Sequence, residues 1–379
     1  FLKSPEPTQR QQPGNKLPCR KLHIVVFFDH GKHCMPFDLG QQSLGVIVAT
    51  FTVCTLIIIF AGTRLASIAV KLAERTGMGQ IIAGALFVGM STSLPGSVLS
   101  VTTAWQGHTD LAIGNALGGI AAQTTFLAIA DLFYRKGNLE HAAASATGLA
   151  QTTLLLSMLS LPLLAYAGPD WMIFHIHPAS ILLLVIYPLG LNLLSAIRDE
   201  PMWLPKKTDL TEEDAKHDTA DTHPESTARL WGEFLAFALV TAVAGHIIGQ
   251  AGLAIVAVTD ISETAVGTFL TAISTSFPEF VSAIAAVRMG AVNLAVGDII
   301  GGNAFDVLFL AASDIAYREG SIYAAFSQQH VFTIALVILM SGVLLLGMLN
   351  RERRGIANIG WESFVVLALY GASAFYLAS

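Results

Sequence analysis

Two short motifs contain the residues best suited to chemistry: STSLPGSVLS at residues 91–100 and STSFPEFVSA at residues 274–283. Both place a Thr-Ser pair shortly before a proline inside an apolar stretch, but the proline is followed by Gly96 in the first motif and by Glu279 in the second. A charged carboxylate at the centre of a membrane-spanning helix costs about 2.5–3.5 kcal/mol on insertion scales. We therefore predict that Glu279 has a function.

A second pair of motifs follows: GNALGGIAAQ at 114–123 and GDIIGGNAFD at 297–306. Their paired glycines allow two helices to approach closely, and they end in Gln123 and Asp306. The prolines of the first pair remove backbone hydrogen bonds and so free carbonyl oxygens inside the membrane. Hydroxyl, carbonyl, amide and carboxylate oxygens are the ligands that hard cations such as Na⁺, K⁺ and Ca²⁺ prefer. The four motifs together predict a cation site.

Several of these residues have a structural explanation as well. Ser and Thr hydroxyls also bond to their own helix backbone or to a neighbouring helix. Gln123 is either an ion ligand or an interhelical hydrogen-bond partner. Asp298 shares roughly one helix face with Asp306. It is either a third carboxylate of the site or proton path, or the partner of a polar neighbour.

The composition predicts the elements that hold these residues. Of the 379 residues, 53% are hydrophobic and 13% are charged, against about 25% charged in soluble domains. Apolar runs of about 20 residues, the length of a membrane span, recur along the chain. They predict an all-α membrane protein embedded in the lipid bilayer. Ten helices are expected at 44–63 (extending to 75), 80–104, 110–133, 145–166, 178–197, 231–256, 263–287, 292–316, 329–350 and 360–378.

The sequence contains no nucleotide-binding loop, nucleophile elbow or metal-ligand cluster of His and Cys. We therefore expect neither an enzyme nor a nucleic-acid-binding protein, and no cofactor beyond a transported cation and H⁺.

The two halves of the chain are copies of one another. Residues 91–137 align with 274–320 without a gap, with 19 identities in 47 pairs. An odd number of five helices per copy requires the second copy to insert upside down. Inverted repeats with helices interrupted at matching places are the sequence signature of secondary transporters, whose site lies near the bilayer midplane.

Lys and Arg predict the orientation. Fourteen of the 21 basic residues fall in one alternating set of loops, and only Arg318 falls in the other. The first set is expected in the cytoplasm and both core termini outside, in a bacterial inner membrane. We interpret 1–40 as a disordered tail or a non-native upstream segment, since Met35 is the first methionine. The remaining parts are a first five-helix repeat at 41–197, a cytoplasmic acidic linker at 198–229, and a second five-helix repeat at 230–379.

The repeats resemble the α-repeats of the sodium/calcium exchanger (cation/Ca²⁺ antiporter) superfamily, whose pattern is G-T-S-x-P-E followed by G-N-x-x-G-S-N. The resemblance covers most of 40–379. It implies the exchanger fold of ten helices, with helix breaks and packing positions at Pro95, Pro278, Gly118 and Gly301. It implies cation and proton ligands at Thr92, Ser93, Gln123, Thr275, Ser276, Glu279 and Asp306, with Glu279 and Asp306 as the metal ligands. Gly96 replaces the acidic ligand of repeat one, and Gly119 and Gly302 replace the usual serines.

The absence of a carboxylate at Gly96 bears on which ion is transported. A dication needs about six to eight oxygens, and this chain has lost several of them in repeat one. We expect an antiporter with alternating access that exchanges Na⁺ or another monovalent cation for H⁺. Ca²⁺ exchange stays open if Asp298 reaches the site. The alternative is a non-transporting membrane scaffold or ion sensor. Gly96→Glu is expected to strengthen divalent binding.

Overall fold

The fold was analysed in a computed structural model, which describes residues 39–76, 88–134, 136–206, 208, 211, 226–352 and 359–378. Residues 1–38 of the predicted tail at 1–40, the start of the predicted helix 80–104 and most of the predicted linker lie outside the described residues. The domain boundaries therefore stay predictions.

The first half consists of helices separated by short turns. A short 3-10 turn, Leu39–Gln41, precedes them. Six of the seven helices of this half correspond to the predicted apolar stretches, and α5 is a single turn that the sequence analysis did not predict. The helices are α1 (Leu44–Thr76), α2 (Gly89–Thr92), α3 (Leu94–Trp105), α4 (Thr109–Asp131), α5 (Leu139–Ala142), α6 (Ala146–Ala167) and α7 (Pro178–Asp199).

The second half repeats this order. Its third span, predicted as one helix over 292–316, is interrupted after Asp306. The elements are α8 (Thr227–Val258), α9 (Glu263–Ala265), a π-helical stretch (Val266–Thr271), α10 (Ala272–Thr275), α11 (Phe277–Arg288), α12 (Val292–Asp306), α13 (Leu308–Ala316), α14 (Gln328–Asn350) and α15 (Trp361–Ala378).

One register relates the two halves over a longer range than the motifs alone indicated. Adding 183 to the bounds of α3 gives the bounds of α11, and adding 183 to those of α2 gives those of α10. The same offset carries the first residue of α1 onto that of α8, and the first residue of α7 onto that of α15. Every side chain in one repeat therefore has a mate 183 residues away in the other.

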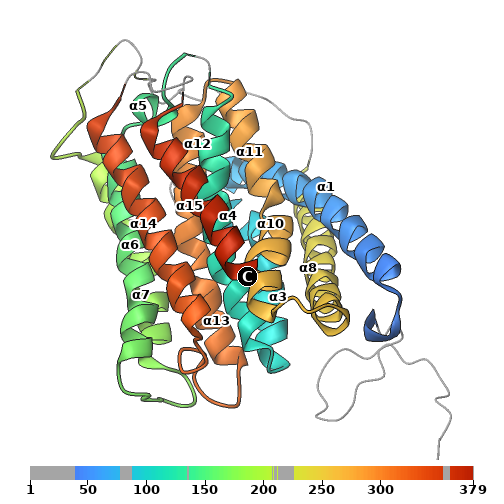
Figure 1. The fold of residues 1–379 in the computed structure, drawn as a ribbon. Coiled ribbons are helices and arrows are strands. Elements are labelled where there is room, and N and C mark those ends of the chain that lie inside the picture. The colour runs from blue at the N-terminus through green and yellow to red at the C-terminus, as the bar shows by residue number, and fades with distance from the viewer. Residues whose placement is uncertain are drawn as a thin grey trace, which may run out of the picture. The chain divides into compact units, whose positions relative to one another are not determined.

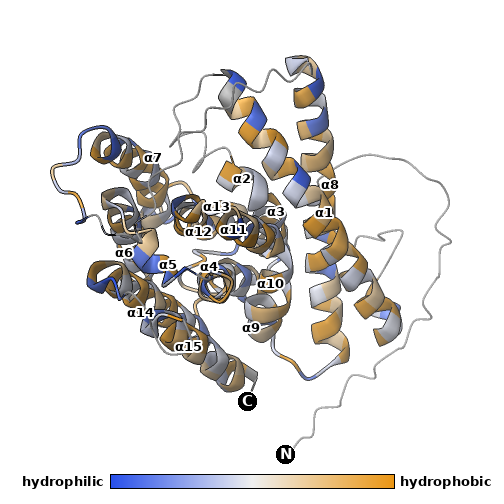
Figure 2. Cartoon of the chain, turned by 90° about the horizontal axis from the view of Figure 1, so that it is seen from above, coloured by the Kyte–Doolittle hydropathy of each residue, from blue (hydrophilic) through white to orange (hydrophobic). Residues whose placement is uncertain are grey.

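Corresponding helices of the two repeats run in opposite directions. Figure 1 shows α5, which follows α4, at one end of the bundle, and α13, which follows α12, at the opposite end. Seen from above, α1 and α8 lie together on one side, and α6, α7, α14 and α15 lie on the other (Figure 2). The central layer between them holds α3, α4, α11, α12 and α13. This is a helical membrane protein of two inverted repeats, with the interrupted helices at its centre.

Length and apolar composition identify the spans. Among the described residues, seven helices are long and apolar enough to cross a membrane, or eight if the bent pair Glu263–Thr275 and Phe277–Arg288 counts as one span. The helix Trp361–Leu377 is apolar but shorter. The residues before α2 are not described, so the predicted number of ten spans is not tested. Helix α4 is buried on nearly all sides, whereas only 22% of the most apolar 18-residue window of α1 is buried, as expected of a helix that faces lipid over that part.

The central helices are broken at matching places. Ser93 separates α2 from α3, and its mate Ser276 separates α10 from α11. The helix axis bends by 47° at the second break. Pro95 and Pro278 lie in the first turn after each break, where the missing N–H of proline has no helical partner to lose. Each break therefore brings side chains from two helix ends towards one point.

Glycines allow the helices around these breaks to pack closely. A Cβ atom on Gly118 would collide with the backbone of Thr268 in the π-helical stretch, and one on Gly245 would collide with the backbone of Pro95. Only a residue without a side chain permits such approach. Through these glycines, α4 packs directly against the π-helical stretch and α8 packs directly against the start of α3.

Candidate cation site

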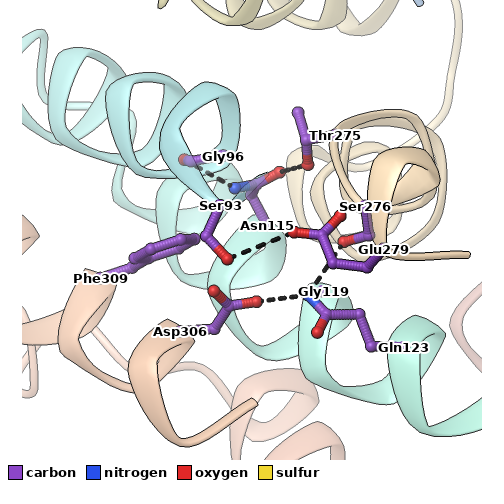
Figure 3. Close-up of a pocket in the computed structure, with 10 residues that line it drawn as sticks. All are labelled: Ser93, Gly96, Asn115, Gly119, Gln123, Thr275, Ser276, Glu279, Asp306 and Phe309. Atoms are coloured by element: carbon purple, nitrogen blue, oxygen red, sulfur yellow. Dashed lines mark hydrogen bonds between the residues drawn. The ribbon is translucent and has the colours of Figure 1, made fainter. Parts of the chain in front are cut away.

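A small pocket lies between the two breaks, where α3, α4, α11 and the junction of α12 and α13 meet (Figure 3). Each repeat contributes half of its wall. The lining residues are Ser93, Gly96, Asn115, Gly119 and Gln123 from repeat one, and Thr275, Ser276, Glu279, Asp306 and Phe309 from repeat two.

Two carboxylates face this pocket, and both come from repeat two. Glu279 lies in the first turn of α11, and Asp306 is the last residue of α12. Each side chain is only 2% exposed. The amino end of α11 carries the partial positive charge of the helix dipole, which favours a carboxylate there. None of the ten lining residues is basic, so no lining side chain neutralises these two acids.

Hydrogen bonds across the pocket join the repeats. The Ser93 hydroxyl donates to Glu279 Oε1 at 3.4 Å. The Gln123 amide donates to Asp306 Oδ2 at 2.6 Å and lies 3.4 Å from the Ser276 hydroxyl. Ser93 and Ser276 are mates, as are Gln123 and Asp306. The site is therefore built from equivalent positions of the two repeats that face one another.

Three oxygen atoms in this pocket have no hydrogen-bond donor among the residues that the structure describes. They are Gln123 Oε1, Glu279 Oε2 and Asp306 Oδ1, all of them buried. Buried polar atoms are nearly always paired, so three unpaired acceptors in one pocket require an explanation. Water, a proton or a cation is the species that such acceptors bind.

Asn115 also lines the pocket, although it was not predicted as a site residue. Its amide donates to Gly96 O at 3.1 Å and to the Ser100 hydroxyl at 2.9 Å. Its oxygen accepts from the Thr271 hydroxyl at 3.0 Å and lies 3.5 Å from that of Thr275. The sequence did contain a signal, because Asn115 is the mate of Asp298. Its amide hydrogen bonds fix it to the protein, and each hydroxyl near its oxygen also has a carbonyl acceptor in its own helix.

Two predicted ligands lie outside the lining of this pocket. The Thr92 hydroxyl donates to the Gly89 carbonyl at 3.1 Å within its own helix. Asp298 is partly exposed on α12, whereas its mate Asn115 is 2% exposed and lines the pocket. Their roles as ligands stay predictions.

The predicted glycines divide by environment. Gly119 lines the pocket, with Asp306 Oδ2 and Ser276 Oγ each 3.6 Å from where its Cβ would lie, whereas Gly118 packs against a backbone. A Cβ on Gly302 would lie 3.3 Å from Gln123 Oε1. Gly301 is buried within α12.

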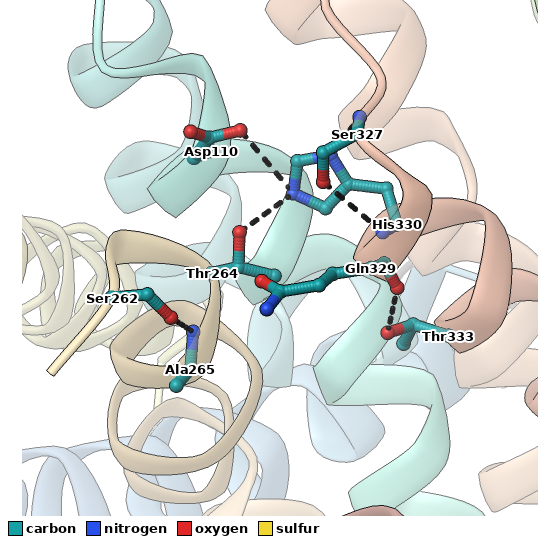
Figure 4. A network of polar contacts seen from close by, with 8 residues as sticks. All are labelled: Asp110, Ser262, Thr264, Ala265, Ser327, Gln329, His330 and Thr333. Carbon is teal, nitrogen blue, oxygen red and sulfur yellow. Dashed lines mark hydrogen bonds and ion pairs between the residues drawn. The ribbon is translucent and has the colours of Figure 1, made fainter. Parts of the chain in front are cut away.

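A separate polar network holds helix ends together away from this pocket (Figure 4). His330 accepts a hydrogen bond from the Ser327 N–H at its Nδ1, so its proton lies on Nε2, 3.4 Å from Thr264 Oγ1 and 3.7 Å from Asp110 Oδ1. The neighbouring His108, which precedes α4, lies 3.0 Å from Glu263 of α9. The hydrogen bond with Glu263 raises the pKa of His108 above its ordinary value. These contacts join repeat one to repeat two at the start of α4.

Comparison with known proteins is consistent with this architecture. A family model described as sodium/calcium exchanger protein matches residues 46–195 and 229–378. The two matched segments are themselves 183 residues apart, which is the offset between the repeats.

Two curated bacterial proteins are similar along most of their length. CaxA of Alkalimonas amylolytica, described as a candidate antiporter, is 28% identical over 318 residues, which cover 82% of this chain and 94% of that protein. The inner membrane protein YrbG of Escherichia coli strain K12 is 26% identical over 330 residues, covering 84% and 94% respectively.

Solved structures share the fold. The H⁺/Ca²⁺ exchanger CAX aligns with a TM-score of 0.65 at 13% identity, over 88% of this chain and 84% of that one. The sodium-calcium exchanger NCX_Mj aligns with a TM-score of 0.56 at 17% identity, over 87% and 98%. At such identities the likeness establishes the arrangement of the helices and leaves the transported ion undetermined.

Proposed function

We propose, because this chain belongs to the sodium/calcium exchanger protein family, that it is a secondary-active antiporter exchanging Na⁺ or another monovalent cation for H⁺ across a bacterial inner membrane. The observation that supports this most directly is the set of unpaired buried oxygens of Gln123, Glu279 and Asp306 around one pocket. Such a set is suited to a cation that has shed its water.

The charge of the pocket favours a monovalent ion. Two buried carboxylates in one pocket titrate as a pair, because each disfavours the charge on the other. The pair therefore retains one proton when no cation is bound, and a monovalent cation can displace it. Binding of the cation and release of the proton are then coupled at Glu279 and Asp306.

The number of available oxygens supports the same conclusion. Ca²⁺ takes six to eight oxygen ligands as a general rule. In this pocket Gly96 and Gly119 bring no side-chain oxygen, and the oxygen of Asn115 already accepts from Thr271. The remaining oxygens of the pocket can more easily satisfy a cation of lower charge that needs fewer ligands than Ca²⁺.

Coupling follows from the cost of moving charge through the bilayer. An empty pocket with two ionised carboxylates is costly to carry between the two faces, whereas a pocket whose charge is reduced by one proton or one monovalent cation is less so. The repeats would then change access only when occupied. A site at the interface of two inverted repeats is the arrangement expected for such alternating access.

The test is transport by the purified protein in proteoliposomes with an imposed pH gradient. Addition of Na⁺ or K⁺ is expected to dissipate the gradient, measured with a pH-sensitive dye. Glu279→Gln and Asp306→Asn are each expected to reduce the rate about tenfold or more, since each removes one charge-assisted ligand worth about 1.5–3 kcal/mol. The matched control is Glu233→Gln, because Glu233 pairs with Arg229 on α8 and does not line the pocket.

Several outcomes would overturn parts of the proposal. Cation-driven proton movement that survives Glu279→Gln would remove that residue from the mechanism. Ca²⁺ is the competing substrate, since CAX is an H⁺/Ca²⁺ exchanger. Ca²⁺-driven proton movement without a response to Na⁺ or K⁺ would refute the monovalent preference. Absence of any cation-dependent transport or thermal stabilisation would favour a scaffold instead.

A further inference from the structure

We propose that Phe309 determines the ion selectivity of the pocket, by filling the space that a carboxylate of repeat one would need. This inference rests on the proposed function and deepens it, because it names the residue that keeps the site at two carboxylates. The established family relationship does not by itself assign any role to this phenylalanine.

The first observation is the space around Gly96, the mate of Glu279. A Cβ atom on Gly96 would lie 3.1 Å from Phe309 Cε2, 3.4 Å from Thr275 Oγ1 and 3.7 Å from Asn115 Nδ2. A carbon atom at 3.1 Å from a ring carbon is tighter than ordinary packing, so the ring must move before any side chain can begin at residue 96. The closest neighbour at the start of the missing side chain is therefore an aromatic ring, which must give way by a few tenths of an ångström.

The second observation is that this ring is held in position. Phe309 is 4% exposed and lies in the first turn of α13, three residues after Asp306. Its ring meets that of Phe305 edge to face, with centroids 6.0 Å apart. Phe305 in turn packs edge to face against Tyr187 of α7, with centroids 5.9 Å apart. Phe309 thus stands at the end of a row of three rings that reaches the peripheral helix α7.

The third observation comes from the other repeat. The mate of Phe309 is Phe126, so both repeats carry phenylalanine at this position. Phe126 does not line the pocket but packs against Phe280 and Phe277 of α11, with centroids 4.6 Å and 6.1 Å away. The carboxylate of Glu279 faces the pocket, whereas beside its mate Gly96 lies the ring of Phe309, which itself belongs to repeat two. The same residue type therefore has a different role in the two repeats.

Together these observations define a pocket with two unlike walls. One wall carries Glu279, Asp306, Ser276 and Gln123, and the other, around Gly96, carries the hydrogen-bonded Asn115, the Phe309 ring and the Ser93 hydroxyl, which donates to Glu279. The second wall gives a cation no charge and few free oxygens. The side chain of Gly96→Glu alone is then crowded by the Phe309 ring from its first carbon atom, which changes the expectation drawn from the sequence.

The experiment combines substitutions at the two positions and measures Ca²⁺-dependent thermal stabilisation in detergent, with Na⁺ titrated in parallel. Gly96→Glu alone is expected to leave the apparent Ca²⁺ affinity within about twofold of wild type. Gly96→Glu with Phe309→Ala is expected to raise it about tenfold or more, through a third carboxylate opposite Glu279. Gly96→Glu with Phe126→Ala is the matched control and is expected to show no gain, because Phe126 lies away from the pocket.

A second background keeps the test decisive if removal of the ring prevents folding. Phe309→Leu retains an apolar side chain but lacks the Cε2 atom that contacts residue 96, so Gly96→Glu with Phe309→Leu is expected to show the same direction of change. An equal gain from Gly96→Glu alone would overturn the inference. So would the absence of gain in both paired variants while wild type still responds to Na⁺ and Glu279→Gln does not. A wild-type protein that responds to no cation would overturn the proposed function, and this inference with it.

Discussion

At the scale of single residues, small differences of environment separate neighbours that look equivalent in the sequence. Gly118 and Gly119 are adjacent in GNALGG, yet one faces a backbone and the other faces the pocket. The first makes a helix crossing possible. At Gly119 a serine would bring a hydroxyl ligand close to Asp306 and Ser276, and the glycine brings none.

This contrast gives a prediction for paired variants. Gly119→Ser is expected to fold normally, since the nearest atoms to its Cβ would be 3.6 Å away, and to increase cation-dependent thermal stabilisation by adding an oxygen ligand. Gly118→Ser is expected to lose about 1–3 kcal/mol of stability through overpacking. Unfolding midpoints in detergent, with and without cation, distinguish the two. Equal loss of stability in both variants would contradict the placement of Gly119 at the pocket.

At the scale of elements, a buried aspartate occupies the end of the third span in both repeats. Asp314 accepts hydrogen bonds from the Ile322 and His177 backbone N–H groups and from the Ser180 hydroxyl. Its mate Asp131 accepts from the Leu139 and Gly360 N–H groups, which are mates of the first two donors. A buried aspartate thus ties the end of the third span to the turn that follows and to the start of the fifth helix. The device occurs in both repeats and stabilises the fold.

The two ends differ in the residues around this aspartate. Tyr323 hydrogen-bonds Ser180 beside Asp314, and its mate beside Asp131 is Glu140, which accepts from Ser363. Burial first, and then the charges of Asp131 and Glu362, raise the pKa of Glu140 well above its ordinary value. The same fold exists in the other repeat without this second acid, so Glu140 is an addition that the helix end does not need.

Glu140→Gln should therefore change how stability depends on pH. A carboxyl whose pKa is raised in the folded state binds more protons when folded than when unfolded, so its contribution is present at low pH and is lost as the pH rises. The midpoint temperature of wild-type unfolding is expected to decrease as the pH is raised from about 5 to about 9. The variant is expected to lie above wild type at the alkaline end and to fall less steeply.

Thermal unfolding across this pH range in detergent measures the effect, with Glu233→Gln on the surface of α8 as control. A wild-type midpoint that rises with pH, or a variant that is destabilised most at high pH, would contradict the burial of an uncompensated acid at this end.

At the scale of the whole molecule, most of the fold could be predicted from the sequence, because apolar run length and the register of Pro, Gly and Asp are properties of the chain alone. The bounds of α6 and α7 lie within two residues of the predicted stretches. The interruptions at Val266–Thr271 and after Asp306 were not predicted, since no proline marks either place in the sequence.

The site was only partly predictable for a related reason. Glu279 and Asp306 stand out because a carboxylate in an apolar helix is costly. Phe309 does not, because a phenylalanine that faces lipid and one that faces a pocket occur in the same kind of sequence. Asn115 is indicated only by its register with Asp298. Thr92 and Ser93 are adjacent and similar, and only the geometry of the break places Ser93 at the pocket.

The orientation in the membrane is a prediction at this scale. The turn at Glu319 is expected outside and its mate Lys136 inside, and both side chains are exposed. In a variant without Cys19, Cys34 and Cys54, a cysteine introduced by Glu319→Cys should react with a membrane-impermeant thiol reagent on intact cells. One introduced by Lys136→Cys should react only after permeabilisation. The opposite pattern would refute the orientation that the basic residues predict.

The unbroken offset of 183 between mates has a consequence for how the protein acquires its direction. Two inverted copies with the same helices contain no intrinsic up or down, because turning the molecule over exchanges one copy for the other. The difference must lie in residues at which the copies disagree, such as Lys136 and its mate Glu319. Those side chains belong to loops and contribute neither to the pocket nor to the helix breaks. The orientation of the protein in the bilayer is therefore predicted to depend on a few loop charges, and exchanging them is expected to reverse it without changing the fold or the pocket.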